Sequence, residues 1–231
     1  MQQDTVSLPA RDFKKILNEW NPAGNDMAAQ VRKELLAWNC DVSMDSKPAL
    51  IYEVWIEQIH HAILPKGLAS SRLAPDVLLR ELAANPEKDE TLSKTLSASL
   101  VEIQQRLGSD ESEWKWGNLH KAYFVHPLHV ANLNLPPRSR PGDGYTVNAT
   151  GGPNFSQAHG ASYREIIDLN DWDRSVTTNV PGESGVPGDR HYGDLIEGWA
   201  NGDYHQLPFS RHAVEAAAEE RIEFLPGAAL P

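Results

Sequence analysis

The strongest constraint on this 231-residue chain is a change of sequence pattern near residue 110. Before this point, apolar residues recur every three or four positions, which is the period of an amphipathic helix. After it, thirteen of the sixteen glycines and most of the prolines separate short β-branched runs. Helices followed by antiparallel strands predict an α+β fold, because a doubly wound sheet needs strands and helices to alternate.

The first part of the chain, residues 1–110, is predicted to be helical. We expect five helices, at residues 12–20, 26–38, 46–64, 76–84 and 89–107. Two of them carry a buried stripe, made of Met27, Val31, Leu35 and Trp38 in one and of Ile51, Trp55, Ile59 and Ile63 in the other. Asp45 or Ser46 can cap the third helix, Pro65 and Gly67 end it, and Gly108 ends the fifth.

The second part, residues 111–231, is predicted to be rich in strands. We expect strands at residues 145–149, 162–169, 175–180 and 221–225, a short helix at 192–199 ended by Gly202, and an exposed loop at 136–144. Asn170, Asp171 and Asp173 suit a hairpin connection. Several of these strands look apolar on both faces, which is typical of the interior of a larger sheet. The two parts are therefore predicted to form one incomplete domain.

Composition narrows the classes of partner. The chain has 32 acidic and 21 basic residues, a formal net charge of −11, and no run of lysine and arginine. Nucleic acid and anionic membrane surfaces are not expected as partners, because both are bound through clustered cations. No apolar stretch is long enough to span a bilayer, and the first residues do not form a signal peptide.

Two groups of histidines are candidate metal ligands. His60 and His61 are adjacent, so on a helix their side chains point about 100° apart. His120, His126 and His129 lie close together in the sequence, but no acidic residue stands at a ligand-like spacing and the HExxH pattern is absent. Packing and hydrogen bonding are the favoured roles for these histidines.

Nucleophile candidates are equally weak. Ser184 lies in a GxSG sequence, which differs from the GxSxG of a nucleophile elbow and favours a turn. Ser162 could be combined with a histidine and an aspartate as a triad. With nine histidines in the chain, such a combination is expected by chance and favours no site. Cys40 is the single cysteine, so it forms no intrachain disulfide, and a structural role is favoured. The acidic runs at 111–113 and 215–220 fit a solvated surface, and the glycines at 142–152 form neither a P-loop nor GxGxxG.

Five blocks in the second part resemble the penicillin acylase (penicillin amidase) family. The first is WKWGNLHKAYFVHPLH, residues 114–129, which is similar to the family's W-x-W-G-x-x-H-x-x-x-F-x-H-P-L stretch. The others, in order, are GDGYTVNAT at 142–150, GASYREIIDL at 160–169, SVTTNVPGESGVP at 175–187, and the histidine-, tryptophan- and tyrosine-bearing segment 191–210. The helical part resembles the family more weakly, at residues 35–39 and 46–64.

The resemblance implies the C-terminal part of the large (β) subunit of an N-terminal-nucleophile hydrolase. Such an enzyme has an αββα fold and a serine at the new N-terminus of a self-cleaved precursor, whose own α-amino group is the base. It hydrolyses linear amides, such as β-lactam side chains or acyl-homoserine lactones, with an oxyanion hole. The resemblance also implies that the full-length parent is periplasmic or secreted and contains calcium. The remainder of the acylase is then the partner of this chain.

No catalytic, cofactor-binding or metal-ligating residue is assigned to this chain, because the family's functional groups belong to earlier blocks. In the matched blocks, Trp116, His120 and Phe124 are expected to pack between layers, Gly182 and Gly185 to permit turns, and Arg164 to pair with a carboxylate. The leading hypothesis is a C-terminal fragment that is inactive alone. The alternatives are a stand-alone binding or subunit-completing protein and, less favoured, a hydrolase using Ser184.

Overall fold

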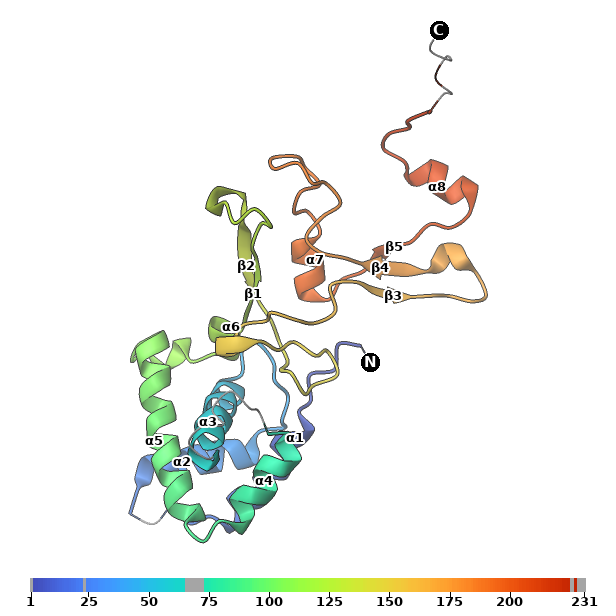
Figure 1. Ribbon diagram of the computed structural model, residues 1–231. Coiled ribbons are helices and arrows are strands. Elements are labelled where there is room, and N and C mark those ends of the chain that lie inside the picture. The colour runs from blue at the N-terminus through green and yellow to red at the C-terminus, as the bar shows by residue number, and fades with distance from the viewer. Residues whose placement is uncertain (1, 23, 65–72, 225–226, 228–231) are drawn as a thin grey trace. The chain divides into compact units, whose positions relative to one another are not determined.

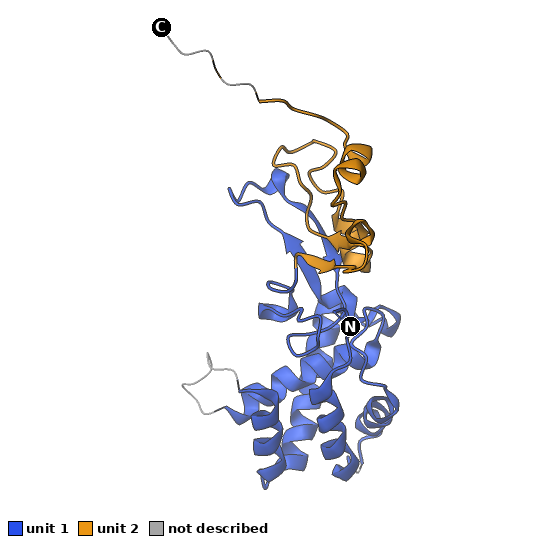
Figure 2. Cartoon of the chain, turned by 90° about the vertical axis from the view of Figure 1, so that its right-hand side faces the viewer, with its two compact units in different colours: residues 1–161 blue, residues 162–231 orange. Residues whose placement is uncertain are grey.

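The computed structural model describes residues 2–22, 24–64, 73–224 and 227. By their internal contacts, these residues form two compact units, unit 1 from Met1 to Ala161 and unit 2 from Ser162 to Pro231 (Figure 2). Both helices and antiparallel strands are present, so the chain is α+β. The units divide later than the change in sequence pattern near residue 110, because residues 111–161 pack with the helices.

The described residues of unit 1 form six α-helices (Figure 1): α1 Leu8–Glu19, α2 Asp26–Ala37, α3 Lys47–Ile63, α4 Pro75–Ala84, α5 Lys88–Leu107 and α6 Trp116–Leu119. The five predicted helices are confirmed within a few residues. The side chains of Ser7, Asn25 and Ser46 cap α1, α2 and α3 by accepting backbone N–H groups, since those N–H groups have no partner inside the helix. The predicted stop at Pro65 and Gly67 lies outside the described residues.

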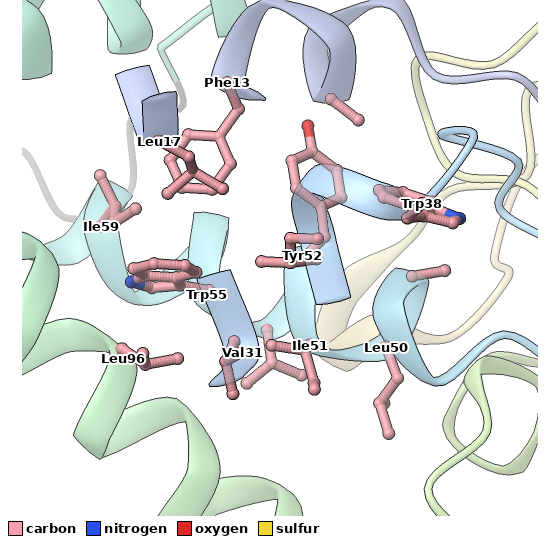
Figure 3. Packing of buried hydrophobic residues seen from close by; sticks show 14 of the residues in the cluster. Phe13, Leu17, Val31, Trp38, Leu50, Ile51, Tyr52, Trp55, Ile59 and Leu96 are labelled. Atoms are coloured by element: carbon pink, nitrogen blue, oxygen red, sulfur yellow. The ribbon is translucent and has the colours of Figure 1, made fainter. Parts of the chain in front are cut away.

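The hydrophobic core of unit 1 is built around α3 (Figure 3). Ile51, Trp55 and Ile59 are completely buried, as their spacing predicts, and Trp55 lies against the rings of Phe13 and Trp20 at centroid distances of 5.2 and 5.5 Å. Met27 was predicted to be buried in α2, and this was wrong. Met27 is 52% exposed, because it lies at the edge of the buried face of α2, which Ala28, Val31 and Leu35 form.

Unit 1 also contains a hairpin that the sequence did not predict. Strand β1, Lys121–Phe124, pairs antiparallel with β2, Leu135–Ser139, in the register Lys121↔Ser139. The loop predicted at residues 136–144 therefore begins as a strand. The strand predicted at 145–149 is instead a turn, because the Asp143 carboxylate accepts the backbone N–H groups of Tyr145 and Thr146.

Unit 2 contains a three-stranded antiparallel sheet with the order β3-β4-β5. Its strands are β3 Arg164–Ile166, β4 Val176–Thr178 and β5 His205–Gln206, and Arg164 lies opposite Thr178. The strands predicted at 162–169 and 175–180 are confirmed in their central residues, as is the hairpin connection between them. The strand β5 was not predicted.

Two helices complete unit 2, α7 Ile196–Asn201 and α8 Arg211–Ala217. Helix α7 begins later than predicted but ends at Gly202, whose left-handed backbone (φ 82°) suits glycine. Helix α8 was not predicted. Residues 221–224, the described part of the strand predicted at 221–225, form no strand. Within the described ranges, no helix combines the length and apolarity that crossing a bilayer requires.

Candidate functional site

Unit 1 contains a cavity of about 590 Å³, lined by described residues. Its walls come from α3, α5, α6 and the loop 143–159. Four carboxylates line it, from Glu53 and Glu57 on α3, Glu102 on α5 and Asp143 in the loop. Arg106, three histidines and the rings of Trp116 and Phe155 also line the cavity, together with several uncharged polar side chains.

Arg106 connects α5 to the loop wall of this cavity. Its guanidinium forms a salt bridge with Glu102 at 2.8 Å, one turn earlier on α5. Nη2 also donates to Asn154 Oδ1 at 3.1 Å, and the group lies 5.3 Å from the centroid of the Phe155 ring. Glu102 in turn accepts a hydrogen bond from Gln58 Nε2 at 2.7 Å, which links α5 to α3. Arg106 therefore orders one wall through charge and stacking together.

A stacked pair of rings forms another wall. Trp116 and His120 lie at opposite ends of the short helix α6, with parallel rings whose centroids are 4.6 Å apart. Trp116 Nε1 donates to the Gly142 carbonyl at 2.8 Å, and His120 Nδ1 lies 2.6 Å from the Phe155 carbonyl. Both side chains are buried, as predicted for packing between layers, and Phe124 is half-buried.

The proton on His120 can be placed from its neighbours. A carbonyl oxygen only accepts hydrogen bonds, so Nδ1 must carry the hydrogen of the neutral ring. Nε2 is buried without a hydrogen-bond partner among the described residues. Burial outweighs the nearby carbonyls of Phe155 and Thr150 and the charge of Asp143, and it lowers the pKa of His120 from 6.5 to about 4. The imidazole is therefore neutral at pH 7.

We expect this histidine to make folding sensitive to acid. The unfolded chain binds the proton with a pKa near 6.5, while the folded chain resists it down to about 4. The contribution of neutral His120 to the unfolding free energy is therefore fully present above pH 6.5. It decreases as the pH falls, by about 2 kcal/mol at pH 5. In His120→Gln, the unfolding free energy measured by urea denaturation should depend less on pH between 7 and 5. The exposed His205→Gln is the control, and equal slopes in all three proteins would contradict the prediction.

The hydroxyl groups of the cavity are held as structural donors. Thr150 Oγ1 donates to the Pro141 carbonyl at 2.8 Å, and Ser156 Oγ donates to the Pro153 carbonyl at 2.7 Å. Neither proton is directed at a histidine, which nucleophilic catalysis by serine would need. The geometry of the cavity supports packing and binding, and it does not assemble a nucleophile with a base.

Ser184 is not part of a triad. Its Oγ accepts the backbone N–H of Val186 at 3.2 Å, which makes it part of a turn. The nearby His191 holds Asp194 at 2.7 Å and Glu219 at 3.1 Å with its two ring nitrogens. Because both nitrogens face carboxylates, His191 is occupied as a bridge between charged groups. Ser162 is exposed.

The other sequence candidates are dispersed. His60 Nε2 accepts the backbone N–H of Leu73, whereas His61 is exposed and lies 3.4 Å from Glu57. His129 is exposed and His126 half-buried, so neither shares the environment of His120. Within the described ranges, no three His, Cys, Asp or Glu side chains are grouped as a metal site would require.

Two further predictions concern single side chains. Cys40 is buried, and burial raises its pKa, so it does not provide a reactive thiolate. Arg164 was predicted to pair with a carboxylate, which is wrong. Its Nη2 donates to the Trp199 carbonyl at 2.7 Å, and its guanidinium lies 5.7 and 5.9 Å from the rings of Trp199 and Tyr204. A carbonyl and two π faces replace the carboxylate as partners for this buried cation.

Sequence comparison decides the family. The family model described as "Penicillin amidase" matches residues 1–216 of this chain. The chain belongs to the penicillin amidase family. The relatives of this family include penicillin acylase 2 proenzyme from Pseudomonas sp. (strain SE83), which is 30% identical over 96% of this chain and 32% of its own length. Acyl-homoserine lactone acylase QuiP from Pseudomonas syringae pv. tomato is 24% identical over 94% of this chain and 31% of its own length.

The fold is similar to part of a solved penicillin acylase. Thermostable penicillin G acylase from Alcaligenes faecalis superposes over 98% of this chain and 48% of its own chain, with a TM-score of 0.53 and 15% sequence identity. The chain thus spans about a third of the length of its curated relatives and about half of the solved chain. It is consistent with one part of a larger processed acylase.

The cavity residues were largely missed by sequence reasoning. Trp116 and His120 were identified as packing residues because they lie in a family block. Arg106 and Asn154 carried no motif, and Asp143, although it lies in the block at 142–150, was given no role. Their interactions join positions up to 48 residues apart, as in the bond from Arg106 to Asn154. Only the fold brings these side chains together.

Proposed function

We propose that this chain is the C-terminal part of the large subunit of a penicillin amidase-type hydrolase, which acts on carbon–nitrogen bonds of linear amides and is inactive in this part alone. The observation that carries the proposal is the match of the penicillin amidase family model to residues 1–216, together with coverage of only about a third of the curated relatives. The serine and threonine hydroxyls in the cavity, which donate to carbonyls, support the inactive state of the isolated part.

In this proposal, the remainder of the acylase supplies the reacting groups. An N-terminal serine attacks the amide carbonyl, its own α-amino group takes the proton, and donors outside this chain stabilise the oxyanion. The present chain supplies helices and β-ribbons to the αββα sandwich around that centre. Calcium would also be held by the remainder, because no cluster of three or more His, Cys, Asp or Glu side chains forms in the described parts of this chain.

The proposed substrates are amides with a linear acyl group, on a β-lactam nucleus or on a homoserine lactone. This range follows the names of the relatives, which are a penicillin acylase and acyl-homoserine lactone acylases. The parent protein is proposed to be periplasmic or secreted, with the remaining acylase polypeptide as its partner.

Purified chain should release no detectable acid from penicillin G or from an acyl-homoserine lactone. The chain contributes no nucleophile paired with a base among its cavity residues, so nothing lowers the barrier to amide attack. Product release is measured by chromatography over hours, with Ser184→Ala assayed in parallel. Turnover by the parent chain would refute the proposal, and its loss in Ser184→Ala would assign the activity to Ser184.

A stand-alone, non-catalytic partner protein is the alternative. The observation that favours it is the core of unit 1, which is continuous from Ala10 to Trp116 within this chain. A stand-alone protein should elute as one species of defined stoichiometry in size exclusion and show a cooperative thermal transition by circular dichroism. Aggregation or loss of tertiary signals would count against it, because unpaired strand edges promote association.

A further inference from the structure

Unit 2 has very little apolar interior of its own. Among its described residues, the buried hydrophobic side chains are Ile196, Trp199 and Ala200. Its buried polar side chains are more numerous: Arg164, Ser175, Thr177 and Thr178. Unit 1, by contrast, contains the whole main hydrophobic cluster. A segment of about 70 residues with so small an interior cannot offset its conformational entropy by burial alone.

The apolar side chains of unit 2 are instead largely on its surface. Leu169 is 82% exposed, Phe209 65% and Trp172 50%. The rings of Trp172 and Phe209 are in contact, with centroids 4.6 Å apart, although the residues are separated by 37 positions in the sequence. We name Leu169, Trp172 and Phe209 the apolar ridge. Aromatic side chains that meet on an exposed surface are typical of the centre of a protein interface.

The ridge is held in place by hydrogen bonds within unit 2. Asp173 Oδ1 accepts the backbone N–H groups of Phe209 and Ser210 at 2.8 and 2.7 Å, and the Asp173 carbonyl accepts Gln206 Nε2 at 2.8 Å. The carboxylate of Asp168 accepts the N–H groups of Asn170 and Asp171, which fixes the turn after Leu169. A surface that is already ordered loses less entropy on binding.

We infer that the apolar ridge is the surface through which unit 2 docks onto the remainder of the acylase, and this rests on the proposed function. The curated relatives are about three times as long as this chain, so a large polypeptide is available to cover the ridge. A second copy is disfavoured by charge, since residues 162–231 contain thirteen acidic and five basic residues. The ridge is bordered in sequence by Asp171 and by Asp168, whose carboxylate lies 3.7 Å from Arg174 Nε. The partner surface is therefore apolar at its centre and basic at its rim.

Cysteine labelling tests this contact directly. Cys40 is buried, so Leu169→Cys introduces a single accessible thiol on the ridge. The probe is penicillin acylase 2 proenzyme from Pseudomonas sp. (strain SE83) with the segment that matches this chain deleted, co-expressed with the variant. Maleimide should label Leu169→Cys about tenfold or more slowly in the complex than in the free chain. Val101→Cys, on the exposed side of α5, reports any general change in thiol reactivity.

A second measurement uses the aromatic pair. Trp172→Ala combined with Phe209→Ala should weaken association about thirtyfold or more, since buried aromatic anchors dominate interface energies. Val101→Ala is the matched control, and circular dichroism of the free variants shows that they fold. The inference is overturned if Leu169→Cys is labelled equally in the free chain and in the complex, or if the double variant binds with unchanged affinity. Self-association through the ridge, or failure of the two polypeptides to associate, would also overturn it. Amide hydrolysis by the free chain would instead refute the proposed function and leave the labelling result intact.

Discussion

Trp55→Ala is expected to lower the unfolding free energy by about 3–5 kcal/mol, the usual cost of removing a large aromatic side chain from a core. Trp55 is completely buried in α3, between Phe13 and Trp20. Its Nε1 also donates to Thr95 Oγ1 at 2.9 Å, which ties α3 to α5. The substitution leaves a cavity and a hydroxyl without this donor. Because small domains have a total stability of about 5–15 kcal/mol, a large share would be lost.

Urea denaturation followed at 222 nm measures this loss, with Trp172→Ala as the matched control. Trp172 has the same side chain but is half exposed, so its truncation should cost about 1 kcal/mol or less. Equal effects at the two positions would contradict the burial pattern of unit 1. A change in the slope with denaturant, rather than in the midpoint, would indicate that two-state unfolding has broken down.

The helices of unit 1 could be predicted because each carries its own periodic stripe and its own end signals. Ser46 and Gly108 mark a start and an end by local chemistry, and both lie where the sequence placed them. Met27 shows the limit of this reasoning. Periodicity gives the approximate face of the helix on which a residue lies, but not where the neighbouring elements set the edge of the buried face, which here includes Ala28 and not Met27.

The strands were harder to predict because they are two to five residues long, too short to show alternation. In β2, Pro136 and Pro137 suggested a loop. The strand tolerates them because β1 is its only partner in the described sheet. On the other edge of β2 no described strand requires the N–H groups that the prolines lack. At 145–149 the residue types favour a strand. Instead, the carboxylate of Asp143 accepts the backbone N–H groups of Tyr145 and Thr146 and stabilises a turn. Local capping therefore outweighed strand propensity.

The cavity could not be predicted, because its walls come from four separate segments. The partner of Arg164 illustrates the same difficulty. The residue type suggested a carboxylate, but the fold presents the Trp199 carbonyl and two aromatic rings. Sequence patterns identify which chemical groups are present. They do not determine which of the available partners the packing brings within hydrogen-bonding distance.

Gly142 is the residue at which one methyl group should disturb this cavity most. Its backbone has a φ of 83°, its N–H donates to the Val42 carbonyl at 2.7 Å, and its carbonyl accepts Trp116 Nε1. A Cβ placed there would lie 2.0 Å from Asn148 Oδ1. Asn148 is itself fixed, because it donates to the Pro141 carbonyl and accepts the Thr146 hydroxyl. The Asn148 side chain therefore cannot move aside without losing two buried hydrogen bonds.

We expect Gly142→Ala to lower the unfolding free energy by about 3 kcal/mol or more, from left-handed strain of about 1–2 kcal/mol together with the displaced hydrogen bonds. Gly24→Ala separates these terms, because Gly24 has a φ of 77° and no atom within 4 Å of the added Cβ. Denaturation of both variants measures the difference between their losses of unfolding free energy. This difference is the cost of displacing the Asn148 side chain. The double variant Gly142→Ala with Asn148→Ala should recover part of the loss, since the clash is then removed. If the two glycine variants are equally stable, the methyl group is accommodated and the loop 142–150 is more adaptable than its hydrogen bonds indicate.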